Sequence, residues 1–115
     1  MTKKYVPARH DIIWIDFEPT KGKEIGKYRP ALVLSSQEYN QTGLLICCPI
    51  STSIRNKITE VLVTQLDEPC VVAANIIHTL SWQDRKAKFI TVAEAETVKQ
   101  VLFRILPLIG AEEIL

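Results

Sequence analysis

Two apolar segments enclosing a basic one determine the fold: Asp11–Phe17 (DIIWIDF), then Glu18–Pro30 (EPTKGKEIGKYRP), then Ala31–Ser35 (ALVLS). The outer segments are short and rich in β-branched or aromatic residues, which is typical of strands. The segment between them is too long for a tight hairpin turn, and long loops in compact domains are usually functional or disordered. We therefore expect two strands joined by a long, exposed loop.

This loop is rich in positive charge. From residue 20 to residue 30 it contains Lys21, Lys23, Lys27 and Arg29 but a single acid, Glu24. Its two glycines leave the backbone free to adapt to a partner. A flexible cationic loop suits a polyanion, with RNA as the leading candidate, although a solvated loop kept basic for solubility is the alternative. Because the net charge is only +1, any affinity for nucleic acid has to come from local clustering.

Length and composition are those of an ordinary soluble globular protein with one domain, residues 1–115. The basic start, Met1–Pro7, lacks the apolar region and cleavage site of a signal peptide. The longest apolar runs are far shorter than the ~20 residues that cross a bilayer. We therefore expect a cytoplasmic protein that does not insert into a membrane.

The three cysteines do not form a metal-binding pattern. Cys47 and Cys48 are adjacent in an apolar run and would point to opposite faces of a strand, whereas Cys70 stands apart. No C-x-x-C spacing occurs, and the only histidines are His10 and His78. We expect buried, reduced thiols, and neither a metal ion nor another cofactor.

Strand patterns continue to about residue 90 and then give way to a helix. Leu44–Cys48 is an apolar run that Pro49 should end, and a helical turn is expected between Ser36 and Gly43. The other predicted strands are residues 58–64, 70–74 and 88–90, with 75–80 as a continuation of the sheet. Short strands followed by a terminal helix predict a small, strongly bent β-barrel with a helix packed on it, a mainly β (α+β) chain.

In the terminal helix, Thr91 and Glu94 form a capping-box pattern. Apolar residues then recur at helical spacing, at Val98, Leu102, Ile105 and Ile109. Pro107 should loosen or end the helix near Leu106. Part of the surface from Leu102 to Ile109, together with Ile114–Leu115, exceeds what this small fold can bury. Such patches commonly mark partner surfaces and predict a homodimer, although a frayed tail would equally explain the last two residues.

The motifs DIIWIDF (11–17), PTKGxE (19–24), RPALVLS (29–35) and PIST (49–52) resemble the MazF/PemK family of bacterial toxin endoribonucleases. The resemblance extends to residues 39–43, 72–75 and 80–82. It implies an SH3-like antiparallel β-barrel of the CcdB/PemK type with a C-terminal helix, and a homodimer. It also implies metal-independent, sequence-specific cleavage of single-stranded mRNA to 2′,3′-cyclic phosphate and 5′-hydroxyl ends, and neutralisation by a cognate MazE-like antitoxin peptide.

The resemblance assigns catalysis to a few residues. The active arginine of the family falls on Arg29, whose planar fork of donors matches phosphate oxygens. The active threonine falls on Ser51, which retains the hydroxyl, and Thr52 beside it offers another. Glu24 matches an acidic position that shapes the site in relatives, although a local partnership with a neighbouring lysine is the alternative. The residues that transfer protons are left unassigned, because arginine is a poor base.

Further residues are candidates for RNA binding rather than chemistry. The loop lysines, together with Arg55, Lys57 and Arg85, are expected to contact the RNA backbone. His78 is expected to contact phosphate, with general-base catalysis as the less favoured alternative. Trp82 either stacks a base or is a structural tryptophan. Asn75-Ile76 stands where many relatives carry Asp-Gln, and since Ile76 cannot hydrogen-bond a base edge, the base preference of the family does not carry over to this chain from the resemblance.

Two functions other than RNA cleavage are alternatives. A gyrase poison of the CcdB type would need a C-terminal helix ending in Trp-Gly-Ile, whereas this chain ends Glu112-Glu113-Ile114-Leu115. A catalytically inert nucleic-acid-binding module would bind RNA through the same basic loop without cutting it.

Overall fold

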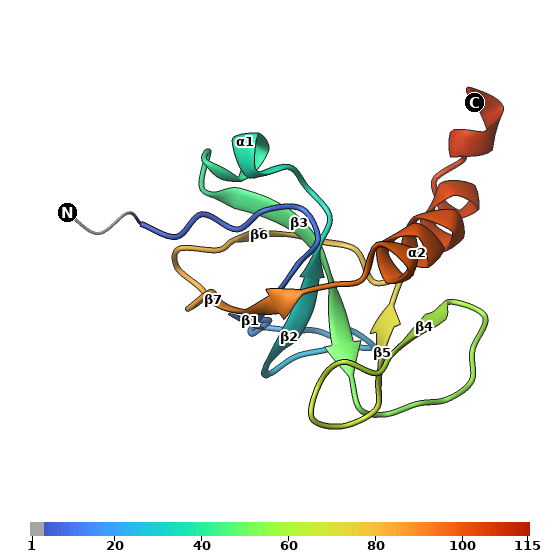
Figure 1. Cartoon of the computed structure of the whole chain (residues 1–115), viewed down its shortest axis with the longest axis horizontal. Coiled ribbons are helices and arrows are strands. Elements are labelled where there is room, and N and C mark those ends of the chain that lie inside the picture. Colours follow the sequence, from blue (N-terminus) through green and yellow to red (C-terminus); the bar gives the residue numbers. More distant parts are fainter. Residues whose placement is uncertain (1–3) are drawn as a thin grey trace.

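Seven strands form one strongly curled antiparallel sheet in a computed structural model that describes residues 4–115 (Figure 1). The strands are β1 (Asp11–Asp16), β2 (Tyr28–Val33), β3 (Leu44–Ser51), β4 (Glu60–Val63), β5 (Cys70–Ala73), β6 (His78–Ser81) and β7 (Lys88–Val92). The helices are α1 (Gln37–Asn40), α2 (Ala95–Leu108) and the short 3₁₀ helix η1 (Ala111–Glu113). The strand order is β4-β5-β3-β2-β1-β7, and β6 pairs with β3. A curled sheet with a terminal helix confirms the predicted fold class.

Strand β2 begins earlier than expected, at Tyr28 rather than Ala31. Its first residues pair with β1, with Arg29 opposite Ile15 and Tyr28 opposite Asp16. Pairing with β1 extends the strand over residues 28–30, which were expected to belong to the loop. The loop is thereby reduced to residues 17–27, and Arg29 stands on the sheet.

Strand β3 does not end at Pro49, as expected, but runs on to Ser51. Pro49 pairs with Ala31 of β2 on one side. On the other side of β3, pairing with β6 stops at Cys47 and pairing with β5 starts at Ile50. A residue without an amide hydrogen is tolerated where a strand changes neighbours, so the proline does not interrupt the sheet.

The curled sheet buries side chains on both of its faces. Ile12, Leu32 and Cys48 lie on one face, in a cluster with the inner side of α2. Cys47 lies in a second cluster on the opposite face, together with the other apolar residues of β1 and β2. The predicted opposite orientation of the two cysteines is confirmed, and all three thiols are free and buried. Burial raises the pKa of Cys48 to about 12.

The start of α2 differs from the predicted capping box. Thr91 belongs to β7, where it pairs with Ile12 of β1, and the N-cap residue is Glu94. The side chain of Glu94 makes no capping hydrogen bond, and the backbone amide of Glu94 donates to Oε1 of Gln65. The helix also continues through Pro107 to Leu108, where the amide of Ile109 closes the last turn on the carbonyl of Ile105 at 3.2 Å. Pairing in the sheet therefore outweighs the local capping signal.

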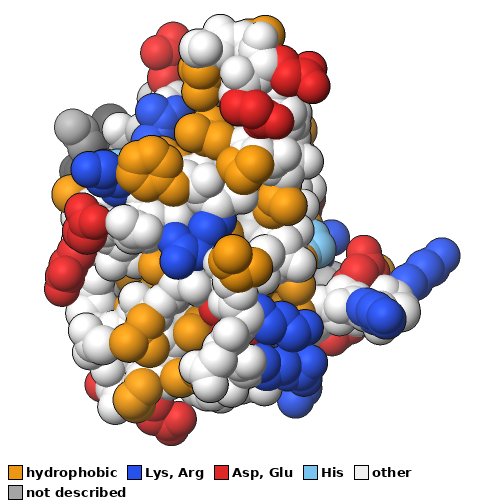
Figure 2. Space-filling model, turned by 90° about the vertical axis from the view of Figure 1, so that its right-hand side faces the viewer, with side chains coloured by type: hydrophobic (Ala, Val, Ile, Leu, Met, Phe, Trp, Pro, Cys, Tyr) orange, Lys and Arg blue, Asp and Glu red, His pale blue; other side chains and the backbone are white. Residues whose placement is uncertain are grey.

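The expected apolar surface is present on the outer side of α2 and beyond it. Phe103 is 54% exposed, Ile109 65% and Ile114 87%. Figure 2 shows hydrophobic side chains, in orange, scattered among basic ones over the face that carries α2. None of the helices within residues 4–115 is long and apolar enough to span a membrane. The expectation that no signal peptide is present rests partly on Met1–Lys3, which lie outside the described residues.

Candidate functional site

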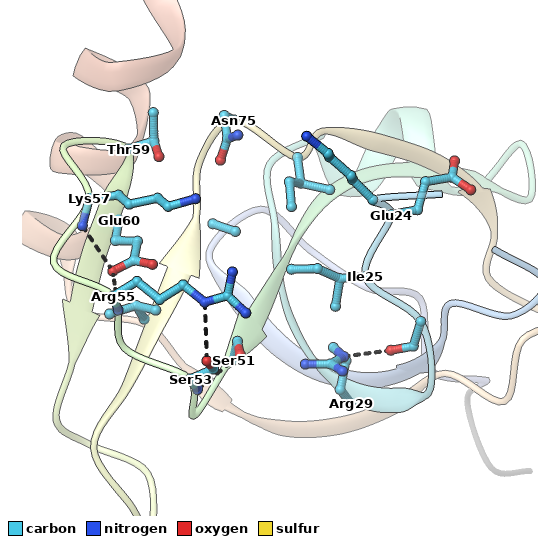
Figure 3. A pocket seen from close by; sticks show the side chains of 15 residues that line it. Glu24, Ile25, Arg29, Ser51, Ser53, Arg55, Lys57, Thr59, Glu60 and Asn75 are labelled. Carbon is cyan, nitrogen blue, oxygen red and sulfur yellow. Dashed lines mark hydrogen bonds between the residues drawn. The ribbon is translucent and has the colours of Figure 1, made fainter. Parts of the chain in front are cut away.

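A groove of about 720 Å³ opens where the loop after β1 meets the ends of β3 and β5 (Figure 3). Its basic residues are Lys23, Arg29, Arg55 and Lys57, and its acids are Glu24 and Glu60. The other lining residues are Ile25, Gly26, Ser51, Ser53, Thr59, Val71, Ala73, Asn75 and Ile76. Four cations against two carboxylates give this surface a local excess of positive charge that the net charge of the chain conceals.

Arg29 is held at the groove by its own strand and by the loop before it. Its Nε donates to the carbonyl of Gly26 at 2.6 Å, and in Figure 3 the guanidinium points toward Ser51. A Cβ on Gly26 would overlap the carboxylate of Glu18, which accepts from the amide of Lys27 at 2.8 Å, so a larger residue there would displace this side chain. Burial lowers the pKa of Arg29. The guanidinium still stays charged in proteins, so a fixed cation faces the groove.

The alternation of side chains at the end of β3 separates the two candidate hydroxyls. Ser51, the last residue of the strand, is half-buried and lines the groove. Thr52 is exposed and lines a different hollow, beside Trp14 and Pro30. Ser53 lines the groove again and its amide donates to Oγ of Ser51 at 3.0 Å. Of the two alternatives, Ser51 is therefore the hydroxyl that faces the groove.

The segment after Ser53 supplies two cations that were expected and one acid that was not. Arg55 and Lys57 line the groove, and Nε of Arg55 donates to Oγ of Ser53 at 3.4 Å. The carboxylate of Glu60 accepts from the amides of both residues, at 3.0 Å and 3.3 Å. Sequence reasoning missed Ser53 and Glu60. The signal for Ser53 was its spacing of two residues from Ser51, and the signal for Glu60 was that it is the first acid after the basic turn.

Only part of the basic loop reaches the groove. Lys23 and Glu24 line it, whereas Lys21 and Lys27 are exposed outside it. The carboxylate of Glu24 accepts from the backbone amide of Lys21, and in Figure 3 it points away from Arg29. Glu24 thus shapes the loop through a backbone amide. Among residues 4–115, no three His, Cys, Asp or Glu side chains gather as a metal site.

His78 does not line the groove. Its ring contacts Phe17 edge-on, with the ring centroids 5.2 Å apart, and its Nε2 is buried without a hydrogen-bond partner in the described structure. Burial is the main cause that lowers the pKa of His78, while Glu24 raises it and Arg85 lowers it further. Neither the expected phosphate contact nor general-base catalysis agrees with this position.

The pKa of His78 predicts a pH dependence of stability. Because the folded-state pKa is lowered from the ordinary value of 6.5, the unfolded chain binds more protons as the pH falls below neutrality. Stability should therefore decrease as the pH falls through 6.5 toward the lower folded-state pKa. His78→Gln should flatten this dependence in urea unfolding measured between pH 8 and pH 5, whereas His10→Gln should retain it. Equal slopes for wild type and His78→Gln would contradict the assignment.

Trp82 and Arg85 lie outside the groove; the burial of Trp82 corrects the expected stacking on a base, and Arg85 makes structural contacts that were not expected. Trp82 is only 8% exposed, and its Nε1 donates to the carbonyl of Asn40 at 2.8 Å. Arg85 donates through Nη1 to the carbonyls of Asp16 and Glu18, at 3.0 Å and 2.7 Å. Of the two alternatives for Trp82, the structure supports the structural one. Arg85 thereby holds the start of the loop whose later part carries Gly26, the residue that accepts from Arg29.

Trp82→Phe should therefore reduce stability and leave catalysis unchanged. The substitution removes one of two donors to the carbonyl of Asn40, which still accepts from the amide of Gly43 at 3.0 Å, so the free energy of unfolding should fall by about 0.5–1.5 kcal/mol, as for one lost hydrogen bond. Urea unfolding measures the loss, and RNA cleavage well below the melting temperature should proceed at the wild-type rate. If Trp82→Phe were as stable as wild type but bound RNA more weakly, the result would favour stacking of a base on Trp82.

The comparisons with known proteins agree with this geometry. The family model of PemK-like, MazF-like toxins of type II toxin–antitoxin systems matches residues 8–109. The endoribonuclease toxin MazF of Escherichia coli K12 is 35% identical over 111 residues, which cover 96% of this chain and 100% of that protein. The crystal structure of MazF from Deinococcus radiodurans matches with a TM-score of 0.88 at 35% identity, covering 93% of this chain and 99% of the other. A MazE–MazF complex of that organism gives 0.82 at 36% identity, covering 93% and 98%.

Proposed function

The chain belongs to the PemK-like, MazF-like family of type II toxins, and we propose that it cuts single-stranded mRNA in the groove, with Arg29 and Ser51 as catalytic residues. It is an endoribonuclease toxin, as its E. coli relative is named. The observation that carries the assignment to this groove is that Arg29 and Ser51 line it from two different strands, β2 and β3.

The proposed reaction needs no external nucleophile. The 2′-hydroxyl of the RNA loses its proton and attacks the adjacent phosphorus, and the P–O5′ bond breaks as the 5′-oxygen gains a proton. The products are a 2′,3′-cyclic phosphate and a 5′-hydroxyl. Because water is not consumed, no metal ion is needed to activate it, and the protein has to orient the phosphate and stabilise the charge of the phosphorane.

Each catalytic residue has a distinct part in this scheme. The guanidinium of Arg29 donates to the non-bridging oxygens of the phosphorane, where negative charge accumulates. The hydroxyl of Ser51 donates to the same oxygens or to the leaving 5′-oxygen.

Two protein partners complete the proposal. A cognate MazE-like antitoxin peptide neutralises the toxin, and a D. radiodurans relative has been solved as a MazE–MazF complex. A second copy of the chain forms a homodimer, supported by the exposed apolar side chains on α2 and at the C-terminus. We propose that this activity takes place in the cytoplasm, which the free, buried thiols and the mRNA substrate support.

Incubation of the purified protein with a long mixed-sequence single-stranded RNA in EDTA tests the proposed function. We expect discrete fragments ending in 2′,3′-cyclic phosphate and 5′-hydroxyl groups, and mapping these ends gives the base preference. An RNA with 2′-deoxyribose at a mapped site is the control and should resist cleavage there. A requirement for Mg²⁺, or fragments with 5′-phosphate ends, would contradict the scheme.

A further inference from the structure

Glu60 is an acid in a groove that is otherwise suited to phosphate. A carboxylate in that position repels an anionic ligand unless its charge is used elsewhere. Its Oε1 accepts from the backbone amides of Arg55 and Lys57, at 3.0 Å and 3.3 Å. Asn56, between them, has left-handed backbone with φ of 56°, which asparagine tolerates better than most residues. Amides that converge at such a turn form an anion-binding concavity, and here the carboxylate of the chain itself occupies it.

This internal anion fixes the direction of Arg55. The hydrogen bond from the backbone amide of Arg55 to Glu60 holds the backbone in place, and Nε of the Arg55 side chain donates to Oγ of Ser53 at 3.4 Å. In Figure 3 the guanidinium groups of Arg55 and Arg29 point toward each other from either side of Ser51. The far end of the segment is held independently, because Nε of Arg104 in α2 donates to the carbonyl of Ile58 at 2.8 Å.

We infer that Glu60 is a positioning residue, which acts through Arg55 to hold a phosphate of the RNA next to the one that reacts at Arg29. The inference rests on the proposed function, because it takes the ligand of the groove to be RNA. The guanidinium of Arg55 binds the neighbouring phosphate, and Glu60 keeps the turn that presents it in one conformation. The carboxylate of Glu60 repels RNA, but it also fixes the backbone of Arg55 and Lys57, and the better placement of these two cations offsets the repulsion.

The test measures binding of an oligonucleotide that cannot be cleaved, with 2′-deoxyribose at the scissile position, by fluorescence anisotropy over a range of salt concentrations. Glu60→Ala should raise the Kd about tenfold, as expected for a lost charge-assisted contact. The slope of log K against log salt should become shallower by about 0.7 if one phosphate contact is lost. Glu60→Gln retains an acceptor oxygen without the charge, so it should bind at least as tightly as wild type. Glu38→Ala removes an exposed carboxylate on α1 and should change neither quantity.

The double variant separates positioning from a merely structural role. If Glu60 acts through Arg55, the variant Glu60→Ala/Arg55→Ala should bind no more weakly than Arg55→Ala alone. Additive losses in the double variant, or a Glu60→Ala protein that binds as tightly as wild type, would overturn the inference. Should Glu60→Ala fail to fold, Asn56→Val gives the same test from an exposed position, because a β-branched residue disfavours the left-handed turn.

The two proposals fail in distinguishable ways. If wild type cleaves RNA while Glu60→Ala and Glu38→Ala bind the oligonucleotide equally, the inference is wrong and the nuclease assignment stands. If wild type binds the oligonucleotide but cleaves no RNA, the proposed function fails, and the double variant still decides whether Glu60 positions Arg55.

Discussion

Arg29→Ala should reduce the rate of RNA cleavage by about 10³-fold, at the upper end of the range for one preorganised donor, since it removes a charged donor from the proposed phosphorane. The fold should persist, because Arg29 is only half-buried and belongs to neither apolar cluster of the core. Single-turnover cleavage of a fluorescent RNA measures the rate, and thermal unfolding verifies that the variant is folded. Binding of the non-cleavable oligonucleotide should fall far less than the rate, as expected for a group whose main interaction forms in the transition state.

Two substitutions serve as controls for Arg29→Ala. Arg29→Lys keeps the charge but loses the planar fork that matches phosphate oxygens, so its rate should lie between those of wild type and the alanine variant. Arg9→Ala removes an exposed arginine of the N-terminal arm, outside the groove, and should cleave at the wild-type rate. If folded Arg29→Ala cut RNA as fast as wild type, the groove would not be the catalytic site.

Ser51→Ala and Thr52→Ala should behave very differently although they are adjacent. The first removes a hydroxyl that lines the groove and should lower the cleavage rate about 10²-fold, at the lower end of the range for one preorganised donor. The second removes a hydroxyl that faces a different hollow and should leave the rate nearly unchanged. The pair is well matched, because both changes delete one hydroxyl near the end of β3.

Ser51→Thr is the complementary substitution. It retains the hydroxyl and adds one methyl group, so cleavage should continue at a rate within the same order of magnitude as wild type. If Thr52→Ala lost most of its RNA cleavage while Ser51→Ala stayed active, Thr52 rather than Ser51 would be the catalytic hydroxyl. Activity in both alanine variants would leave Arg29 without a hydroxyl partner. The gyrase-poison alternative has no support among the named relatives, which are endoribonucleases.

The elements that sequence reasoning predicts well are those whose apolar pattern reflects burial directly. β1 follows from a run of β-branched residues, and the helical turn after Ser36 is present as α1, whereas only the second half of β2, residues 31–33, lies in the predicted apolar segment. The errors occur where a distant segment decides the outcome. Thr91 resembles a helix cap locally but pairs with β1, and Pro49 is accommodated because β3 changes neighbours beside it.

The same reasoning explains which site residues could be anticipated. Arg29 and Ser51 were expected from the family resemblance, and the structure brings both to one groove. The positions of Trp82 and Arg85 could not be predicted, because tryptophan and arginine near basic residues suit RNA as well as they suit buried carbonyl groups. Glu60 escaped notice because a single acid at the start of a strand has no distinctive pattern until the turn before it is folded.

The placement of Arg29 and Ser51 on paired strands has a consequence for how such a toxin diversifies. Their spacing is fixed by β2 and β3, whose inner residues are fully enclosed, so the cutting chemistry tolerates little change. Lys23, Arg55 and Asn75 surround them on connecting segments, which accept substitutions and insertions at small cost to folding. We therefore expect substitutions in these connecting segments to change which RNA sequence is cut without altering the proposed catalytic pair.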